Sequence, residues 1–212
     1  MPIVTYIIIG ITCLVSFAAF NDPEIKGKYI FNAYLINHKR QWYRFFTHAV
    51  LHADIPHLLF NMMTLYFFGP FVESVFVAIF GKIQGEFFYI LLYVSSIIMS
   101  SYYSFEKHKE DMYYNALGAS GAVCAILFAY IIINPMSSIF LMFIPIGIPG
   151  FLFGILYLVL SSYLAKRGQD NIGHDAHFWG GVYGVVFTIA IHFQFLGLFV
   201  DQVKFYLHSY FG

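Results

Sequence analysis

The sequence of 212 residues contains little charge, since Asp, Glu, Lys and Arg together make up only 10% of it. Soluble domains contain about 25% charged residues, so this scarcity excludes a soluble fold. The 11 basic and 11 acidic side chains also cancel. Without an excess of positive charge the chain has no basic face for nucleic acid, and we expect the lipid bilayer to surround it instead.

Cysteine is also scarce. Its two copies, Cys13 and Cys124, each lie inside an apolar run, so the sequence contains neither a disulfide framework nor a CxxC zinc site. Low-complexity, Gly/Ser-rich and repeated segments are missing as well. We therefore expect one compact membrane domain over residues 1–212.

Hydrophobic residues make up 60% of the chain. A helix needs about 20 mostly apolar residues to cross a bilayer, and six windows approach this length with few or no Asp, Glu, Lys or Arg. They predict an all-α membrane protein, a bundle of six transmembrane helices with an ordered first loop. The approximate helix ranges are 3–20, 55–78, 87–105, 119–134, 150–165 and 175–199.

The segments outside these windows carry most of the charges. Residues 22–47 also contain several aromatic side chains, and we expect them to form an ordered loop at the level of the lipid headgroups. Residues 201–212 are expected to form a short interfacial tail. The first window lacks the basic start of a signal peptide and is interpreted as a retained helix. Glu73, near the end of the second window, is expected to reach an interface.

Polar side chains gather in the first turns of the second, fourth and sixth predicted helices. Because consecutive spans alternate in direction, these three helices start on the same side of the membrane, and their first turns can meet. The residues concerned are His52, His57 and Asn61, then Gly118 to Gly121 with Ser120, then His174 and His177. Polar groups inside a membrane are costly and mark functional sites, so the three clusters predict a single site.

The chemistry that these residues fit is nucleophilic acyl transfer. Serine reacts readily only when a neighbouring base takes its proton, and His177 is the candidate base for Ser120. The developing oxyanion needs donors, which the N–H groups of a helix start and the side chains of His57 and Asn61 can provide. Asp175 is two residues from His177 and on another helix face, so a Ser-His dyad is expected rather than a triad.

Glycines accompany these polar residues. Gly118 and Gly121 lie close to Ser120, and Gly180 begins a Gly-x-x-x-Gly pattern that ends at Gly184. Each feature alone is most simply explained by helix packing, because small residues let two backbones approach closely. A hydrogen bond between side chains of two helices requires such an approach, and the combination with Ser120 and the histidines favours a site.

With these residues the sequence resembles the rhomboid family of intramembrane serine proteases. The resemblance rests on stretches in the order and spacing of that family, namely residues 42–48, His52, 57–62, 118–121 and 176–180. It implies a bacterial-type six-helix core in which Ser120 attacks a peptide bond, with His177 as base and His57 and Asn61 at the oxyanion. It further implies a multi-pass protein of the bacterial inner membrane that cleaves transmembrane protein substrates. No cofactor and no metal are expected.

Some positions depart from the family pattern. By the resemblance, His52 corresponds to the family's structural histidine, which links the first loop to the second helix. A departure is Cys124, four residues after Ser120, where the family commonly has an aromatic residue under the ring of the catalytic histidine. We expect Cys124 to leave the ring of His177 less constrained than an aromatic would, unless Phe178 or Tyr183 fills the gap. Nine of the eleven Lys and Arg residues lie on the side of the site. The positive-inside rule would make that side cytoplasmic, whereas the family topology implies a site that opens outward.

Two other interpretations stay open. His48 with His52, and His174 with His177, have spacings that can present two imidazoles to one ion, which would indicate a membrane metal enzyme but leaves Ser120 without a role. The second is a rhomboid-like protein that binds transmembrane segments without cutting them.

The substrate itself can be described only by its chemistry. A transmembrane helix must unwind before a buried nucleophile can reach its backbone, which favours substrates with Gly, Ala, Ser or Pro near one end. The fifth predicted helix is uncharged and carries Phe151 and Phe153 at its start, and we expect a substrate to enter on the side of this helix.

Overall fold

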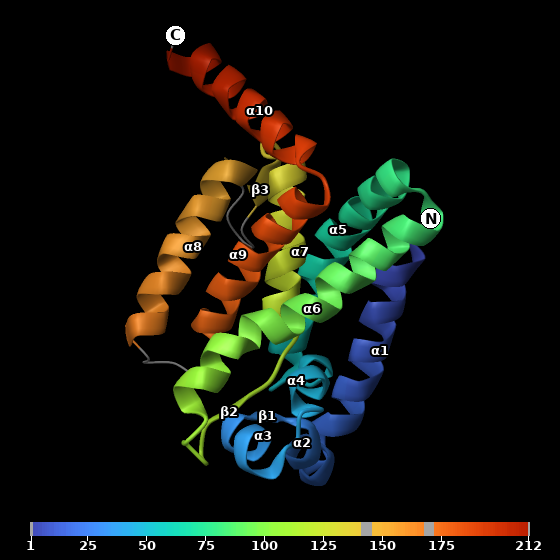
Figure 1. Cartoon of the computed structure of the whole chain (residues 1–212), viewed down its shortest axis with the longest axis vertical. Coiled ribbons are helices and arrows are strands. Elements are labelled where there is room, and N and C mark those ends of the chain that lie inside the picture. Colours follow the sequence, from blue (N-terminus) through green and yellow to red (C-terminus); the bar gives the residue numbers. More distant parts are fainter. Residues whose placement is uncertain (1, 141–145, 168–171, 212) are drawn as a thin grey trace.

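A computed structural model describes residues 2–140, 146–167 and 172–211 (Figure 1). Its long helices are α1 (Ile3–Phe20), α5 (Ile55–Phe80), α6 (Lys82–His108), α7 (Ser120–Ile133), α8 (Gly150–Arg167), α9 (His174–Ile191) and α10 (Gln194–Phe211). Between α1 and α5 lie α2 (Pro23–Tyr29), α3 (Ala33–Lys39), α4 (Arg44–Thr47) and the 3₁₀ turn η1 (His48–Val50). Two short antiparallel pairs join β1 (Phe31–Asn32) to β2 (Asn115–Ala116) and β3 (Ser138–Phe140) to β4 (Gly147–Pro149).

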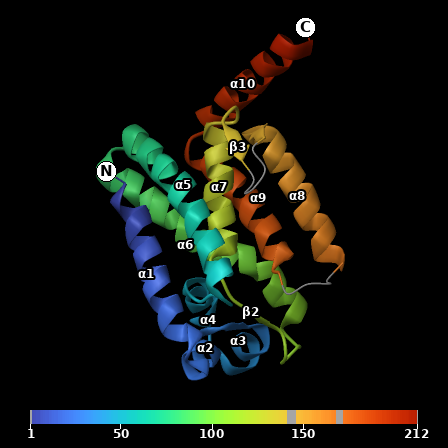
Figure 2. The ribbon, with the colours of Figure 1, turned by 180° about the vertical axis from the view of Figure 1, so that it is seen from behind.

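Helix α7 lies at the centre of the bundle, where it packs against α5, α6, α8 and α9 (Figure 1, Figure 2). Its sequence is apolar on every face, and eleven of its 14 residues are buried. A helix that is hydrophobic all round is stable where every face is covered. The core of the protein is therefore built around the helix that begins at Ser120.

Four helices, α1, α5, α6 and α8, are long and apolar enough to cross a membrane, and α9 with α10 passes the same test as a bent pair. Large apolar side chains are exposed on the outer faces of these helices, for example Leu14 (74%), Phe67 (63%) and Val159 (64%). Such a surface is stable against lipid rather than water. The described chain is thus a helical membrane bundle, while the count of six spans stays a prediction.

The C-terminal region differs from the sequence-based prediction. A single helix over residues 175–199 is wrong, because α9 ends at Ile191 and α10 begins at Gln194, with a bend of 113° between them. His192 adopts an extended backbone (φ −155°, ψ 91°). Phe195 then turns into the core, where it is only 3% exposed and its ring lies 5.1 Å from that of His192. The segment expected to be a short tail is helical up to Phe211 and projects from the bundle (Figure 1).

Glu73 does not reach an interface, contrary to the expectation. It is fully buried in α5, and its carboxylate accepts hydrogen bonds from the first turn of α1. The N–H groups of a helix start have no partner within their own helix and attract negative charge. These groups of α1 stabilise the carboxylate inside the bundle.

The first loop is a folded element at the end of the bundle where α7 begins (Figure 1). Arg44 is buried there and donates to the carbonyl oxygens of Gly27 (3.1 Å) and Ile30 (2.6 Å). Phe45 packs against Phe105 of α6, with ring centroids 5.3 Å apart. Strand β1 of the loop pairs with β2, which directly precedes the turn into α7. The ordered loop predicted for residues 22–47 is thus tied to the segment that leads to Ser120.

Candidate active site

Helix α5 begins beside the start of α7. Asp54 caps α5 by accepting the N–H of His57 at 2.8 Å. The Nδ1 atom of His57 accepts the N–H of Ala53 at 3.4 Å, an arrangement that assigns the ring proton to Nε2. A Cβ atom on Gly118 would lie 2.9 Å from this Nε2, and Gly118 has a φ of +120°, which glycine alone adopts readily. The imidazole N–H of His57 therefore lies directly at the turn into α7.

Asn61 lies one turn further along α5 and is buried. Its Nδ2 atom donates one hydrogen to the carbonyl oxygen of His57 at 2.9 Å. The amide nitrogen of asparagine carries two hydrogens, so this bond fixes the side chain and uses only one of them.

His52 is buried between α1 and the turn into α7. The hydroxyl of Ser16 donates to the carbonyl oxygen of Val50 (2.8 Å) and thus accepts from Nδ1 of His52 (2.9 Å). The Nε2 atom of His52 accepts the N–H of Ala119 at 3.5 Å, which requires a neutral ring. Burial lowers the pKa of His52 to about 3. Its contacts join α1 to the start of α7, whereas the expected link was between the first loop and α5.

His48 supports the same turn from the loop side. Its carbonyl oxygen accepts the N–H of Gly118 at 3.0 Å. Its Nε2 atom lies 3.2 Å from the hydroxyl of Ser101, which itself donates to Ile97, so Nε2 is the donor in this pair. Burial lowers the pKa of His48 to about 4. Two neutral histidines therefore hold the backbone immediately before Ser120.

Ser120 is the first residue of α7 and is half-buried. The first hydrogen bond of the helix runs from the N–H of Val123 to the carbonyl oxygen of Ala119 (2.9 Å). The N–H groups of residues 120–122 precede it and have no acceptor within their own helix. This turn combines a hydroxyl group with backbone donors and the positive end of the helix dipole.

The first turns of α9 pack directly on this turn of α7. A Cβ atom on Gly121 would lie 3.4 Å from the carbonyl oxygen of Ala176, and one on Gly180 would overlap the carbonyl oxygen of Gly121. One helical turn on, a Cβ atom on Gly184 would lie 2.7 Å from Cα of Ala125. The glycines thus let the two backbones touch over the stretch that carries Ser120 on one side and His177 on the other.

The ring of His177 lies beside an aromatic residue that the sequence did not indicate. Tyr157 of α8 has its ring centroid 6.4 Å from that of His177, with 30° between the planes. Its hydroxyl lies 3.1 Å from Sγ of Cys124, one helical turn after Ser120. Phe178 and Tyr183, the two residues that could have filled this place, make other contacts. Tyr183 donates to Ser95 (2.8 Å), and Phe178 packs edge-on against Trp179. The residue beneath the histidine therefore comes from another helix.

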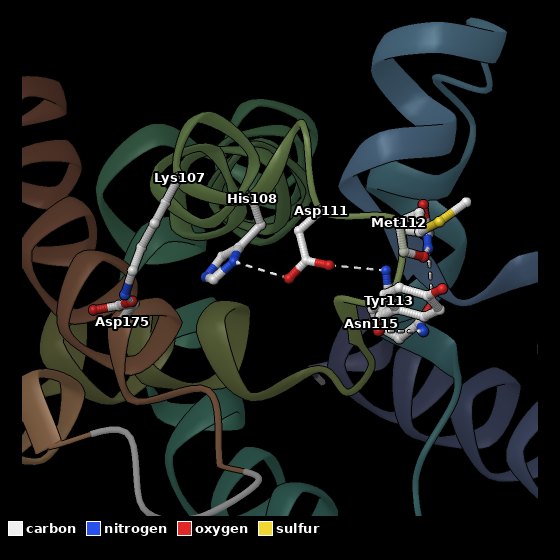
Figure 3. Close-up of polar contacts among 8 residues, drawn as sticks. Lys107, His108, Asp111, Met112, Tyr113, Asn115 and Asp175 are labelled. Carbon is white, nitrogen blue, oxygen red and sulfur yellow. Dashed lines mark hydrogen bonds and ion pairs between the residues drawn. The ribbon is translucent and has the colours of Figure 1, made fainter.

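Asp175 interacts with a neighbouring helix. Its carboxylate forms an ion pair with Lys107 of α6 at 3.3 Å, as Figure 3 shows. In the same region His108 contacts Asp111 at 4.0 Å, and the loop that follows is held by a bond from the N–H of Tyr113 to Asp111 (2.9 Å). These contacts fix the start of α9 and the loop before α7 relative to α6.

The histidines whose spacing suggested a metal site make other contacts in the structure. Both ring nitrogens of His52 and one of His48 make the bonds given above, and the rings of His174 and His177 stand nearly perpendicular, at 85°. Within the described ranges no group of three or more His, Cys, Asp or Glu residues has the arrangement to hold an ion. This geometry gives the metal interpretation no support.

The fold and site define a multi-pass helical membrane protein with a serine, histidines and helix-start donors at one end of its bundle. The family model described as the Rhomboid domain matches residues 39–194, which is well over half of the chain. The protein therefore belongs to the rhomboid family.

Individual relatives agree with this assignment. The RHOMBOID-like protein 12, mitochondrial, of Arabidopsis thaliana is 30% identical over 66% of this chain and 44% of its own length. The rhomboid protease GluP of Bacillus subtilis is 30% identical over 71% of this chain and 26% of its own. The rhomboid protease AarA of Providencia stuartii is 24% identical over 75% and 59%, respectively. The chain thus spans about three fifths or less of the length of these relatives.

Proposed function

We propose that this chain is an intramembrane serine protease in which Ser120 is the nucleophile and His177 is the general base. The observation that carries the proposal is the contact between α7 and α9 through Gly121 and Gly180. It brings the turn that begins with Ser120 against the turns that carry His177, as transfer of a proton between two helices requires.

The reaction follows from the roles of these groups. The Oγ atom of Ser120 attacks the carbonyl carbon of the scissile peptide while its proton passes to His177. His177 then gives this proton to the departing amine, which leaves an ester on Ser120. A water molecule, deprotonated by His177, attacks the ester carbonyl. The bond to Oγ then breaks, His177 returns the proton to Oγ, and the new carboxylic acid end of the substrate leaves.

The oxyanion formed in each half of the reaction is bound by donors at the same end of the bundle. The N–H groups of residues 120–122 and the Nε2–H of His57 face the turn before α7, and the second amide hydrogen of Asn61 completes the set. Donors that are fixed before the reaction stabilise the developing charge most effectively. Gly118 and Gly121 permit the approach, while His52 and His48 hold the backbone that presents the donors.

The substrates are transmembrane segments of other membrane proteins, in keeping with the lipid-facing surface of the bundle. A segment with Gly, Ala, Ser or Pro near its end unwinds most readily and exposes its backbone. The side of α8 stays the proposed side of substrate entry. Phe151 and Phe153 lie in the first turn of this helix, where Phe151 contacts Tyr206 of α10 (5.8 Å). We assign the protein to the inner membrane of a bacterium, as the bacterial-type core implies.

The proposal is tested by labelling the detergent-solubilised protein with a fluorophosphonate probe, which reacts with an activated serine. We expect wild type to be labelled, Ser120→Ala to be unlabelled and His177→Ala to be labelled much more slowly. Ser138→Ala is the matched control, because Ser138 is exposed in β3, away from this site, and it should label like wild type.

Other outcomes point to the alternatives. Wild type that is labelled no better than Ser120→Ala contradicts the protease. Loss of peptide hydrolysis on treatment with EDTA would favour a metal enzyme. Capture of a transmembrane peptide without labelling or cleavage would favour a rhomboid-like binding protein.

A further inference from the structure

Tyr157 occupies the junction of three helices. Its ring extends from α8 and lies 5.9 Å from the ring of Phe128 on α7 and 6.4 Å from that of His177 on α9. Phe153, one turn earlier on α8, stacks on it at 5.7 Å and 29°. The ring of Tyr157 is thereby held on one side by apolar neighbours and presents another side to the imidazole.

The hydroxyl of Tyr157 is also fixed. It lies 3.1 Å from Sγ of Cys124, which is 5% exposed. A buried tyrosine hydroxyl needs a hydrogen-bond partner, and the thiol provides one. Cys124 stands four residues after Ser120, on the same face of α7. The Tyr157–Cys124 bond adds to the ring contacts with Phe128 and Phe153, and together they place the tyrosine ring relative to the turn of the proposed nucleophile.

We propose that Tyr157 is a positioning residue that sets the orientation of the His177 ring, with Cys124 holding the tyrosine hydroxyl. The inference rests on the proposed function, since it concerns the base of that reaction. An imidazole can rotate about two side-chain bonds, and a base accepts a proton efficiently only when one ring nitrogen is aimed at the donor. The ring of Tyr157, tilted by 30° with its centroid 6.4 Å from that of His177, limits these rotations.

The arrangement also gives Cys124 a structural role. Its sulfur is directed at the Tyr157 hydroxyl and lies in an apolar environment deeper in the bundle than Ser120. Loss of the thiol alone should leave the tyrosine ring in place, because Phe128 and Phe153 still contact it.

The test compares the pH dependence of fluorophosphonate labelling in four single variants. Tyr157→Leu removes the ring, Tyr157→Phe keeps the ring without the hydroxyl, Cys124→Ala removes the thiol, and Tyr163→Leu is the control. Tyr163 lies on the same helix but is 50% exposed and contacts Arg167. Small displacements of a catalytic group cost up to about 10²-fold in rate, so we expect Tyr157→Leu to label roughly 10- to 100-fold more slowly.

The other variants separate positioning from folding. Tyr157→Phe and Cys124→Ala should stay within a few-fold of wild type, and Tyr163→Leu should equal it. In Tyr157→Leu the pH of half-maximal labelling should change, which mere loss of stability would not cause. Tyr157→Met, which fills the space without a ring, replaces Tyr157→Leu if the latter does not fold.

A swap of the two side chains provides a rescue. Because Tyr157 and Cys124 share one space, Tyr157→Cys combined with Cys124→Tyr moves the ring from α8 to α7 and should label faster than Tyr157→Cys alone.

Two results would overturn the positioning role. One is a ring-free variant that labels at the rate and with the pH profile of wild type. The other is equal loss in Tyr157→Phe and Tyr157→Leu. Either result leaves the protease itself intact as long as wild type labels and Ser120→Ala does not.

Discussion

Thr5 of α1 donates two hydrogen bonds to one carboxylate oxygen of Glu73 in α5, from its N–H at 2.8 Å and from its hydroxyl at 2.7 Å. Tyr89 of α6 extends the contact, because its hydroxyl lies 2.8 Å from that of Thr5. Since all three side chains are fully buried, one network joins α1, α5 and α6 at the end of the bundle opposite the proposed site.

Removal of the carboxylate should therefore destabilise the protein. Glu73→Ala leaves the N–H groups of Val4 and Thr5 without their acceptor, and hydrogen bonds to a charged group contribute about 1.5–3 kcal/mol each. We expect a clear fall in the midpoint of thermal unfolding in detergent, a smaller fall in Glu73→Gln, and none in Glu24→Ala, whose side chain is exposed. Equal midpoints for Glu73→Ala and Glu24→Ala would show that the network contributes nothing.

The contact between α7 and α9 predicts a steric effect. In Gly180→Ala the new methyl group meets the carbonyl oxygen of Gly121, and overpacking of this kind costs about 1–3 kcal/mol. We expect lower thermal stability together with slower fluorophosphonate labelling of Ser120, because the two helices must separate. Gly10→Ala is the control, since a Cβ atom there meets no atom within 4 Å. Full labelling of Gly180→Ala would argue against the need for this close approach.

The two buried histidines predict a loss of stability in acid. Their pKa values in the folded protein are about 4 for His48 and about 3 for His52, whereas an unfolded histidine has a pKa near 6.5. Between these values the unfolded chain binds more protons, so the free energy of unfolding falls as the pH falls from about 6.5 toward 4. The slope is at most about 1.4 kcal/mol per pH unit for each histidine.

Thermal unfolding measured between pH 7.5 and 4 checks this effect. His52→Asn should have a shallower dependence on pH than wild type, whereas Ser138→Ala, a change at an exposed position that removes no titrating group, should keep the slope of wild type. An unchanged slope in His52→Asn would mean that other groups govern the acid sensitivity.

The donors proposed for the oxyanion predict a kinetic effect. Loss of one such donor typically lowers kcat by about 10²–10³-fold. We expect His57→Ala to reduce peptide hydrolysis clearly and Asn61→Ala to reduce it less, because one amide hydrogen of Asn61 is already bonded to the helix backbone. Thermal stability should stay close to wild type in both. A double variant with full activity would remove both residues from the mechanism.

Much of the fold follows from the distribution of charge along the sequence. The uncharged window 3–20 coincides with α1, and the starts expected near residues 55, 119 and 150 lie within one residue of those of α5, α7 and α8. The same criterion predicted a helix that is too short. The prediction covered residues 87–105, whereas α6 begins at Lys82 and ends at His108. Charged side chains are tolerated in the end turns of a membrane helix because they reach the interface, so a window without charges ends too early.

The contacts that the sequence did not reveal depend on how the helices are rotated relative to one another. Tyr157 lies on α8, 20 positions before His177, in a stretch whose only charges are in the last turn of the helix, and no local pattern distinguishes it from Tyr163. In the sequence, Glu73 has the position of a charge at the membrane interface. Its partners at the start of α1 are distant in sequence and are known only from the structure. Polar clusters at helix starts could be predicted from their spacing, whereas partners from other helices required the packing itself.

The shortness of α7 has a consequence for what the protein can reach. Its 14 residues extend over about 21 Å at 1.5 Å per residue, whereas the hydrocarbon layer is about 30 Å thick. If its far end lies at one surface, the end with Ser120 lies about 9 Å short of the other. A soluble polypeptide would have to leave water to descend to that depth, while a transmembrane segment is already there. For the proposed protease, the length of α7 would therefore favour transmembrane segments over soluble polypeptides before any side chain is recognised.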